Sequence, residues 1–171
     1  MRRRTLLLSA AAFAGAAHAQ QLARASEVVY LHGSAISPHR IYTPEELAAM
    51  PADMLASFVQ SRGAPGAEQR STVRGVRLGK LVERSLTPVA RADWKNLVVT
   101  ATATDGYRAQ FSWAELTNTA EGEGVLVLFE RDGRPLEPRE GRIALMATGD
   151  FRLGARHVRN LLRIEVRPLA D

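Results

Sequence analysis

The chain of 171 residues contains no cysteine. This absence excludes disulfide bonds, zinc sites with cysteine ligands and iron–sulfur clusters. It also excludes a cysteine nucleophile and any metal that is held by a protein thiolate. The sequence has no internal repeat and no low-complexity tract either. With 46% hydrophobic and 24% charged residues, its composition is that of a globular protein rather than a rod or a disordered chain.

Most of the chain also lacks an excess of either charge. The first 19 residues contain three of the 23 Lys and Arg residues and none of the 18 Asp and Glu residues, so the rest of the chain carries a net charge of only +2. Such a small charge gives little electrostatic reason to expect binding to nucleic acid. We therefore expect no nucleic acid partner.

Long hydrophobic runs are missing except at the N-terminus. Three arginines at residues 2–4 precede an apolar stretch at residues 6–17 and a small-x-small cleavage site that ends at Ala19. This pattern predicts a signal peptide over residues 1–19 and a periplasmic or secreted protein without a membrane span. A retained anchor is the alternative. The arginine pair before the leucines also resembles the twin-arginine export signal, and a general secretory signal fits the same residues.

The sequence that follows predicts a flexible leader over residues 20–26 and a single domain over residues 27–171. Strands are indicated by runs of Val, Ile and Thr or by alternating apolar residues, and these cover residues 27–31, 54–59, 97–104, 107–113, 125–129, 143–147 and 161–166. Asp-Gly pairs at residues 105–106 and 132–133 are typical of tight turns. Residues 62–71 predict a long polar loop.

Two segments predict short helices. Thr43 is suited to cap a helix, Pro44 fits its first position, and Glu46 completes a capping box, while Pro51 limits the helix to about two turns. Apolar residues at helical spacing predict a second helix at residues 78–86. Several short strands with a few small helices predict a mixed α+β domain that is mainly β.

Common motifs for phosphate, dinucleotide and serine-nucleophile sites are missing. Residues 75–80 are one residue short of the P-loop spacing, and the glycines at residues 122–124 precede a predicted strand instead of following one. No serine stands in a G-x-S-x-G pattern. The histidines after the signal peptide show no metal-ligand spacing, so we expect no metal site. They are His32, His39 and His157.

Charged clusters are of two kinds. Acidic pairs at Glu45-Glu46 and at Glu137 with Glu140 predict helix-terminus and solvent-exposed roles. Near the C-terminus, arginines spaced four, three, four and four apart are Arg152, Arg156, Arg159, Arg163 and Arg167. If residues 152–163 form a helix, the first four arginines share one face, and guanidinium groups suit the bidentate binding of phosphate or carboxylate. A solvated stripe on a core helix is the alternative.

Three longer segments are informative together. Residues 72–82 read Thr-Val-Arg-Gly-Val-Arg-Leu-x-x-Leu-Val, residues 104–107 read Thr-Asp-Gly-Tyr, and residues 158–166 read Val-Arg-Asn-Leu-Leu-Arg-Ile-Glu-Val. In this order they resemble the "f-x-G-v-x-L-x-x-L-L", "D-G-Y" and "v-K-w-l-x-x-I-e-v" elements of the molybdopterin-binding domain of sulfite oxidase-type oxidoreductases. Further segments that resemble this family are residues 43–47, 125–128, 132–136 and 141–145.

The resemblance implies a mixed α+β fold that holds molybdopterin, a molybdenum-pterin cofactor, in a basic pocket. It also implies a cysteine thiolate bound to the metal, and the loop at residues 62–71 offers none. Ala144 stands where the family has an arginine, and Arg159-Asn160 stand where it has lysine-tryptophan. Of these positions, Arg159 alone keeps a cation.

These observations predict an exported domain of this oxidoreductase family that resembles its molybdopterin-binding domains, lacks molybdenum catalysis and binds a pterin-like or other anionic ligand. The residues expected at the ligand site are Tyr107, Arg152, Arg156, His157 and Arg159. One alternative is an active molybdopterin-dependent oxidoreductase in which Ser61, Ser71 or water replaces the thiolate. Another is a scaffold that binds a periplasmic protein partner.

Overall fold

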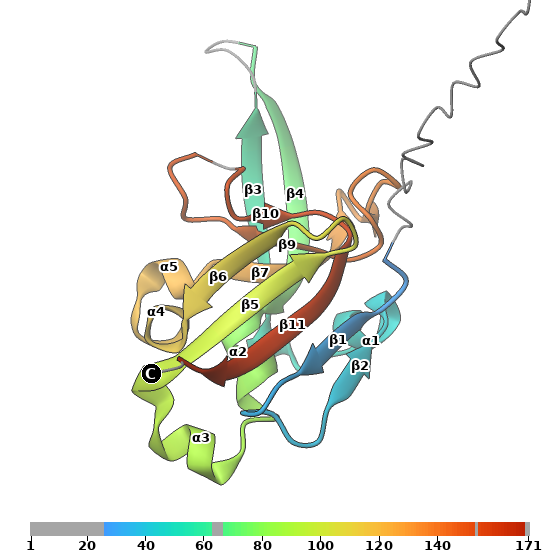
Figure 1. The fold of residues 1–171 in the computed structure, drawn as a ribbon. Helices are drawn as coiled ribbons and strands as arrows, with labels where there is room; N and C mark the ends of the chain where they lie inside the picture. Colours follow the sequence, from blue (N-terminus) through green and yellow to red (C-terminus); the bar gives the residue numbers. More distant parts are fainter. Residues whose placement is uncertain (1–25, 63–66, 153, 170–171) are drawn as a thin grey trace, which may run out of the picture.

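The computed structural model describes residues 26–62, 67–152 and 154–169 (Figure 1). The signal peptide expected at residues 1–19, and residues 20–25 of the expected leader, lie outside the described residues. Ser26 is the last residue of that leader, and it is buried. Its hydroxyl donates a hydrogen bond to the carbonyl oxygen of Ile143 at 2.9 Å. Ser26 is therefore already part of the folded domain.

Two β-sheets form the framework. The five-stranded sheet has the order β2-β1-β11-β5-β6, with β1 (Val29–His32), β2 (Arg40–Tyr42), β5 (Leu97–Ala103), β6 (Arg108–Ser112) and β11 (Leu161–Pro168). The six-stranded sheet has the order β10-β9-β7-β4-β3, with β8 paired to β7. Its strands are β3 (Leu55–Arg62), β4 (Gln69–Arg77), β7 (Val125–Arg131), β8 (Arg134–Pro135), β9 (Ala144–Ala147) and β10 (His157–Val158).

Short helices connect the strands. They are α1 (Pro44–Ala48), α2 (Leu78–Glu83), α3 (Pro88–Ala92), α4 (Trp113–Asn118) and α5 (Ala120–Glu123), with 3₁₀ turns η1 (Ala52–Met54) and η2 (Trp94–Asn96). Strands hold 43% of the described residues and helices 23%, which confirms the prediction of a mainly β α+β domain. None of the described helices is both long and apolar enough to cross a membrane.

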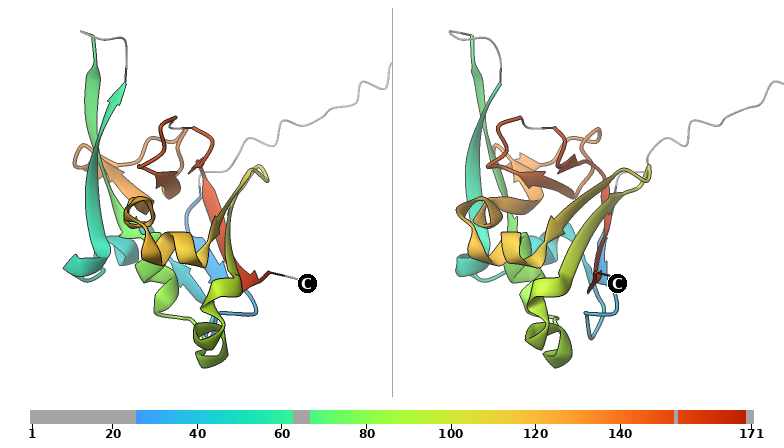
Figure 2. Two further views of the ribbon diagram at one scale, coloured as in Figure 1. Left: turned by 90° about the vertical axis from the view of Figure 1, so that its left-hand side faces the viewer. Right: turned by 60° about the vertical axis from the view of Figure 1, so that its left-hand side comes forward.

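The main core lies between the two sheets (Figure 2). Successive side chains of a strand point to opposite faces of its sheet. On β7, Val125 and Val127 therefore enter the main core, while Leu126 and Leu128 enter a second, smaller apolar cluster on the outer face of the six-stranded sheet. The sequence run at residues 125–129 is continuously apolar because both of its faces are buried.

Several local predictions are confirmed. Thr43 caps α1 in a capping box: its hydroxyl accepts from the Glu46 amide at 3.2 Å, and the Glu46 carboxylate accepts from the Thr43 amide at 2.8 Å. The second predicted helix is α2. The turn between β7 and β8 places Asp132 and Gly133 at φ values of 51° and 73°, as a tight hairpin turn requires.

The prediction of a long polar loop at residues 62–71 is wrong at both ends. β3 extends to Arg62 and β4 begins at Gln69, and these two residues pair with each other. Figure 2 shows that this hairpin projects from the body of the domain. Strand pairing continues beyond the apolar residues because backbone hydrogen bonds do not require apolar side chains.

The condition under which the arginines would share a helix face, a helix at residues 152–163, is not met in the described residues. β10 pairs with β9, and β11 lies between β1 and β5 and hydrogen-bonds to both. Asn160, between the two strands, has a φ of 49°. A spacing of four is even, so it places Arg163 and Arg167 on one face of a strand. The first four arginines of the cluster therefore do not share a helix face, because pairing with two neighbouring strands outweighs the helical spacing.

Candidate functional site

The candidate site lies on the outer face of the six-stranded sheet. Side chains of β4, β7 and β9 form the small apolar cluster there, and Leu136 packs against them from the segment that follows β8. The same segment continues to Glu140, which turns back toward the end of β7. Polar side chains from five separate stretches of chain meet beside this cluster.

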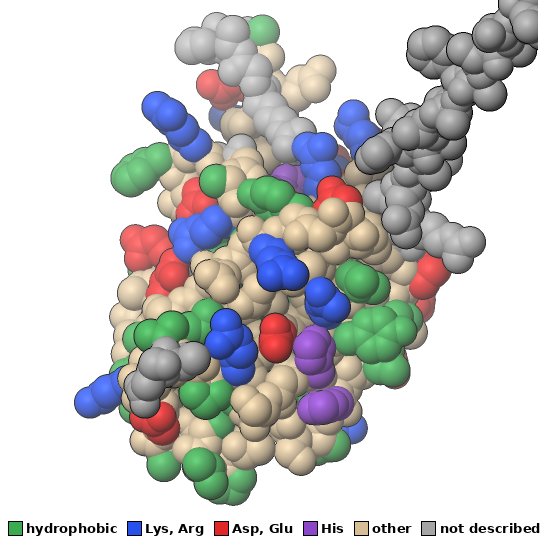
Figure 3. Space-filling view, in the orientation of Figure 1, with side chains coloured by type: hydrophobic (Ala, Val, Ile, Leu, Met, Phe, Trp, Pro, Cys, Tyr) green, Lys and Arg blue, Asp and Glu red, His purple; other side chains and the backbone are tan. Residues whose placement is uncertain are grey.

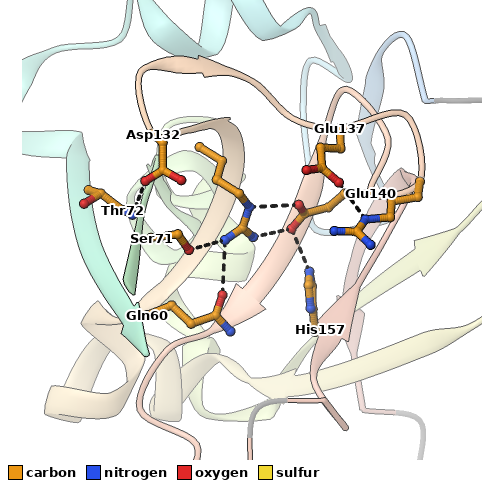
Figure 4. Close-up of polar contacts among 9 residues, drawn as sticks. Gln60, Ser71, Thr72, Asp132, Glu137, Glu140 and His157 are labelled. Carbon is orange, nitrogen blue, oxygen red and sulfur yellow. Dashed lines mark hydrogen bonds and ion pairs between the residues drawn. The ribbon is translucent and has the colours of Figure 1, made fainter. Parts of the chain in front are cut away.

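Arg131, at the end of β7, is the centre of these polar contacts (Figure 4). Its guanidinium donates to both carboxylate oxygens of Glu140, at 2.8 and 3.1 Å. Its Nη1 also donates to Ser71 Oγ at 2.8 Å and to Gln60 Oε1 at 3.2 Å. His157 Nε2 lies 3.1 Å from Glu140 Oε1. The result is a bidentate ion pair that is held by strands β3, β4 and β10.

The Glu140 side chain is only 9% exposed, so the solvent-exposed role that the sequence predicts for it is wrong. Burial by itself raises the pKa of Glu140. The hydrogen bonds from His157 and Arg131 and their charge outweigh burial and lower this pKa from 4.5 to about 2. Glu140 is therefore a carboxylate at neutral pH, and it balances the charge of Arg131.

We expect acid to destabilise the protein through Glu140. Because the pKa of its folded state lies below the unfolded value, the stabilisation is complete above about pH 4.5 and is lost as the pH falls toward about 2. Urea unfolding at a series of pH values should show a shallower loss in the Glu140→Gln variant, by at most about 1.4 kcal/mol per pH unit for one proton. Equal slopes for the two proteins would contradict this assignment.

A cleft of about 470 Å³ opens above this network. Ser71, Arg131, Glu140 and His157 line it from the network. The other described residues that line it are Gln69, Arg70, Asp132, Glu137, Arg139 and Arg159. The cleft therefore combines four arginines with three carboxylates and a histidine.

Most of these charges are already paired. Arg131 is paired with Glu140, and Arg139 lies 2.6 Å from a carboxylate oxygen of Glu137. The carboxylate of Asp132 accepts from the backbone N–H of Thr72 at 2.6 Å. Among the described residues, Arg70 and Arg159 form no ion pair, and both are exposed. Two guanidinium groups thus remain available at the cleft.

Two of the five residues predicted for the ligand site line this cleft. His157 lies in its buried wall and Arg159 at its exposed edge. Neither Tyr107 nor Arg152 is among the described residues that line it. The Tyr107 hydroxyl donates to the carbonyl oxygen of Ala155 at 2.5 Å, and Arg152 is exposed on the segment between β9 and β10.

Arg156 has a structural position instead. Its guanidinium forms ion pairs with Asp150 and Glu115, and it lies 5.0 Å from the ring centre of Phe111. The hydrogen bonds to Asp150 and Glu115 raise the pKa of Arg156. Arg156 therefore does not line the cleft beside Arg159, because β10 separates the two in the chain and the Arg156 ion pairs connect α4 to the segment before β10.

Sequence reasoning missed Gln60, Arg70, Arg131 and Glu140. The one local sign of this site in the sequence is the position of Arg131, at the end of an apolar run and directly before the Asp-Gly turn. Its partner Glu140 is separated from it by a turn, and Gln60 and Ser71 come from a hairpin about 60 to 70 residues earlier. A charged residue at the end of a buried strand indicates a buried partner but does not identify it.

The residues at this site do not fit molybdenum held by a thiolate. The chain has no cysteine. Ser71, one of the expected substitutes, is occupied as an acceptor for Arg131, and Ser61 is exposed on β3. Within the described ranges, no group of three or more His, Asp or Glu side chains could hold a metal ion. The two unpaired guanidinium groups of the cleft are hydrogen-bond donors, which suit an oxyanion instead.

Comparisons with known proteins gave no match, either to the models of protein families or among curated proteins.

Proposed function

We propose that this chain is a non-catalytic anion-binding domain with a sulfite oxidase-like molybdopterin-binding fold, and that it holds a pterin-like or other small anionic ligand in the cleft. One observation carries the proposal. Arg70 and Arg159 line the cleft without an ionic partner among the described residues, directly beside a buried network in which the charges are already balanced.

The geometry favours an anion for an electrostatic reason. Because Glu140 neutralises Arg131 and Glu137 pairs with Arg139, the charges left in the cleft are those of Arg70 and Arg159 against the single carboxylate of Asp132, which is a net positive charge. Guanidinium groups bind carboxylate and phosphate oxygens in a planar, bidentate manner. The cleft volume of about 470 Å³ lies in the range of small-molecule sites.

The family resemblance supports the same position. In the closing segment that resembles "v-K-w-l-x-x-I-e-v", Arg159 stands at the place of the family's lysine, and it is one of the two unpaired cations of the cleft. The absence of cysteine opposes a catalytic molybdenum centre. Together, these points favour a ligand-binding domain over an active oxidoreductase.

The test is calorimetric titration with inorganic phosphate and with pterin phosphates. An Arg70→Gln/Arg159→Gln variant should lose roughly a hundredfold in affinity, because hydrogen bonds to charged groups contribute about 1.5 to 3 kcal/mol each. The matched control is Arg163→Gln/Arg167→Gln. It changes the net charge by the same amount. Both residues lie on β11 in the five-stranded sheet. This sheet is toward the viewer in Figure 3, where charged side chains and histidines lie at the surface.

Equal affinity of the two double variants would contradict the assignment of the cleft. If the wild-type protein binds none of these anions, the proposal fails and a scaffold that binds a protein partner becomes the better interpretation. Metal analysis of protein made in a host that synthesises molybdopterin tests the enzyme alternative. We expect far less than one molybdenum per chain, and a ratio near one would overturn the non-catalytic assignment.

A further inference from the structure

A second hollow lies on the outer face of the five-stranded sheet, on the opposite side of the domain from the cleft. Its volume is about 490 Å³, which is within the range of small-molecule sites. The cleft and this hollow share no lining residue among those that the structure describes. We name it the β1 groove, after the strand that runs through it. Its lining includes Tyr30, His32, His39, Ile41, Leu162 and Arg163.

The floor of the β1 groove is largely apolar and open to solvent. Tyr30 on β1 is 42% exposed and Ile41 on β2 is 56% exposed. The two are register partners, so their side chains are neighbours on the outer face of the sheet. Leu162 joins them where the register of β11 against β5 shifts, an irregularity of the kind that redirects a side chain. Single exposed apolar residues are common, but a contiguous group in a hollow is typical of a binding site.

A cation lies at the edge of this floor. Arg163 on β11 is the register partner of Tyr30 on the side away from Ile41. It is exposed, and it forms no ion pair with a described residue. Arg40 on β2 also lines the groove, and it too has no ion pair within the described ranges. These guanidinium groups are therefore available to a ligand.

Two histidines complete the polar part of the groove. The ring centres of His32 and His39 are 6.2 Å apart, and each ring has an N–H that can donate. None of the described lining residues is acidic, and Glu165, the register partner of His32, lies outside the lining. Figure 3 shows hydrophobic, basic and histidine side chains together at the surface over β1 and β11. The groove thus presents an apolar floor with cations and N–H donors at its edge.

We propose that the β1 groove binds an amphiphilic carboxylate, that is, a small ligand with an apolar body and one anionic end. The body lies on Tyr30 and Ile41, where it removes apolar surface from water. The carboxylate lies at Arg163, because a guanidinium group can donate to both of its oxygens. A neutral ligand leaves the cations unused, and a small inorganic anion leaves the floor exposed. This site is independent of the function proposed for the cleft.

The test uses trans-cinnamate and two matched probes. Cinnamamide has the same apolar body without the charge, and acetate has the charge without the body. Calorimetric titration of the wild-type protein should show that cinnamate binds about tenfold or more tightly than cinnamamide, because it adds charge-assisted hydrogen bonds. Acetate should also bind about tenfold or more weakly than cinnamate, because it buries little apolar surface.

Two variants assign these differences to residues. Arg163→Gln should weaken cinnamate binding about tenfold or more and leave the affinity for cinnamamide within about twofold. Arg167→Gln is its matched control, since it removes the same charge from an exposed position on β11 that does not line the groove. Ile41→Thr keeps a β-branched residue on β2 and should weaken both cinnamate and cinnamamide. Circular dichroism checks that the variants, all at exposed positions, keep the fold.

The Arg70→Gln/Arg159→Gln variant of the cleft separates the two sites. It should bind cinnamate as the wild-type protein does, whereas Arg163→Gln should keep the affinity for inorganic phosphate, which has no apolar body. Loss of cinnamate binding in the cleft variant would move this ligand to the cleft and overturn the groove. Equal effects of Arg163→Gln and Arg167→Gln, or no preference of wild type for cinnamate over cinnamamide and acetate, would overturn it as well. None of these results affects the phosphate test of the cleft.

Discussion

A Glu140→Leu variant should be less stable than the wild-type protein by about 3 to 5 kcal/mol, because it leaves the guanidinium of Arg131 buried without a counter-charge. The Arg131 side chain is only 17% exposed. Its remaining acceptors are the neutral oxygens of Ser71 and Gln60. His157 loses its carboxylate partner in the same variant. The free energy of unfolding from urea titration measures the effect.

Two further variants isolate the cause. Arg131→Met/Glu140→Leu removes both charges and should recover most of the lost stability, since an apolar pair can replace a buried ion pair at little cost. Glu130→Leu removes the carboxylate of a partly exposed pair, whose oxygen lies 3.7 Å from Arg74, and should cost no more than about 1 kcal/mol. A Glu140→Leu effect as small as that of Glu130→Leu would show that the buried pair contributes little.

The Arg156→Met variant should lose about 2 to 3 kcal/mol of stability and keep its affinity for anions. Without Arg156, the carboxylates of Asp150 and Glu115 face each other with no cation between them. The Phe111 ring also loses its contact with the guanidinium. The estimate lies below that of a fully buried pair because the Arg156 side chain is 28% exposed.

Arg159→Gln is the matched comparison for Arg156→Met. It should change the thermal midpoint little, because Arg159 forms no ion pair with a described residue, and it should weaken phosphate binding. Measuring stability and phosphate affinity for both variants therefore distinguishes the structural arginine from the binding one. A loss of affinity in Arg156→Met as large as that in Arg159→Gln would contradict the separation.

Local chemistry was readable from the sequence wherever the residues that determine a structure are neighbours. Thr43, Pro44 and Glu46 specify the start of α1 because all the capping hydrogen bonds lie within one helical turn. The Asp132-Gly133 pair specifies a hairpin because few residues tolerate positive φ. The apolar run at residues 125–129 indicates a strand that is buried on both faces.

The same local patterns are ambiguous where pairing partners are distant. Arginines spaced by four residues fit one face of a helix, but the spacing is even and fits one face of a strand equally well. The choice at residues 161–168 is made by β1 and β5, which supply backbone partners on both edges of β11. The pattern of residues 161–166 predicts a strand, but it does not identify these two neighbours.

The candidate site depends still more on tertiary structure. The sequence by itself determined the mainly β α+β class, the turns, the helix cap and the lack of a thiolate, and it singled out His157 and Arg159, which line the cleft. Only the folded chain brings Gln60, Arg131 and Glu140 together, because their strands are neighbours in the sheet but not in the sequence. Burial decided their roles, because charges and amides that look ordinary in the sequence need partners once they are buried, and Gln60 Oε1 and Glu140 both find theirs in Arg131.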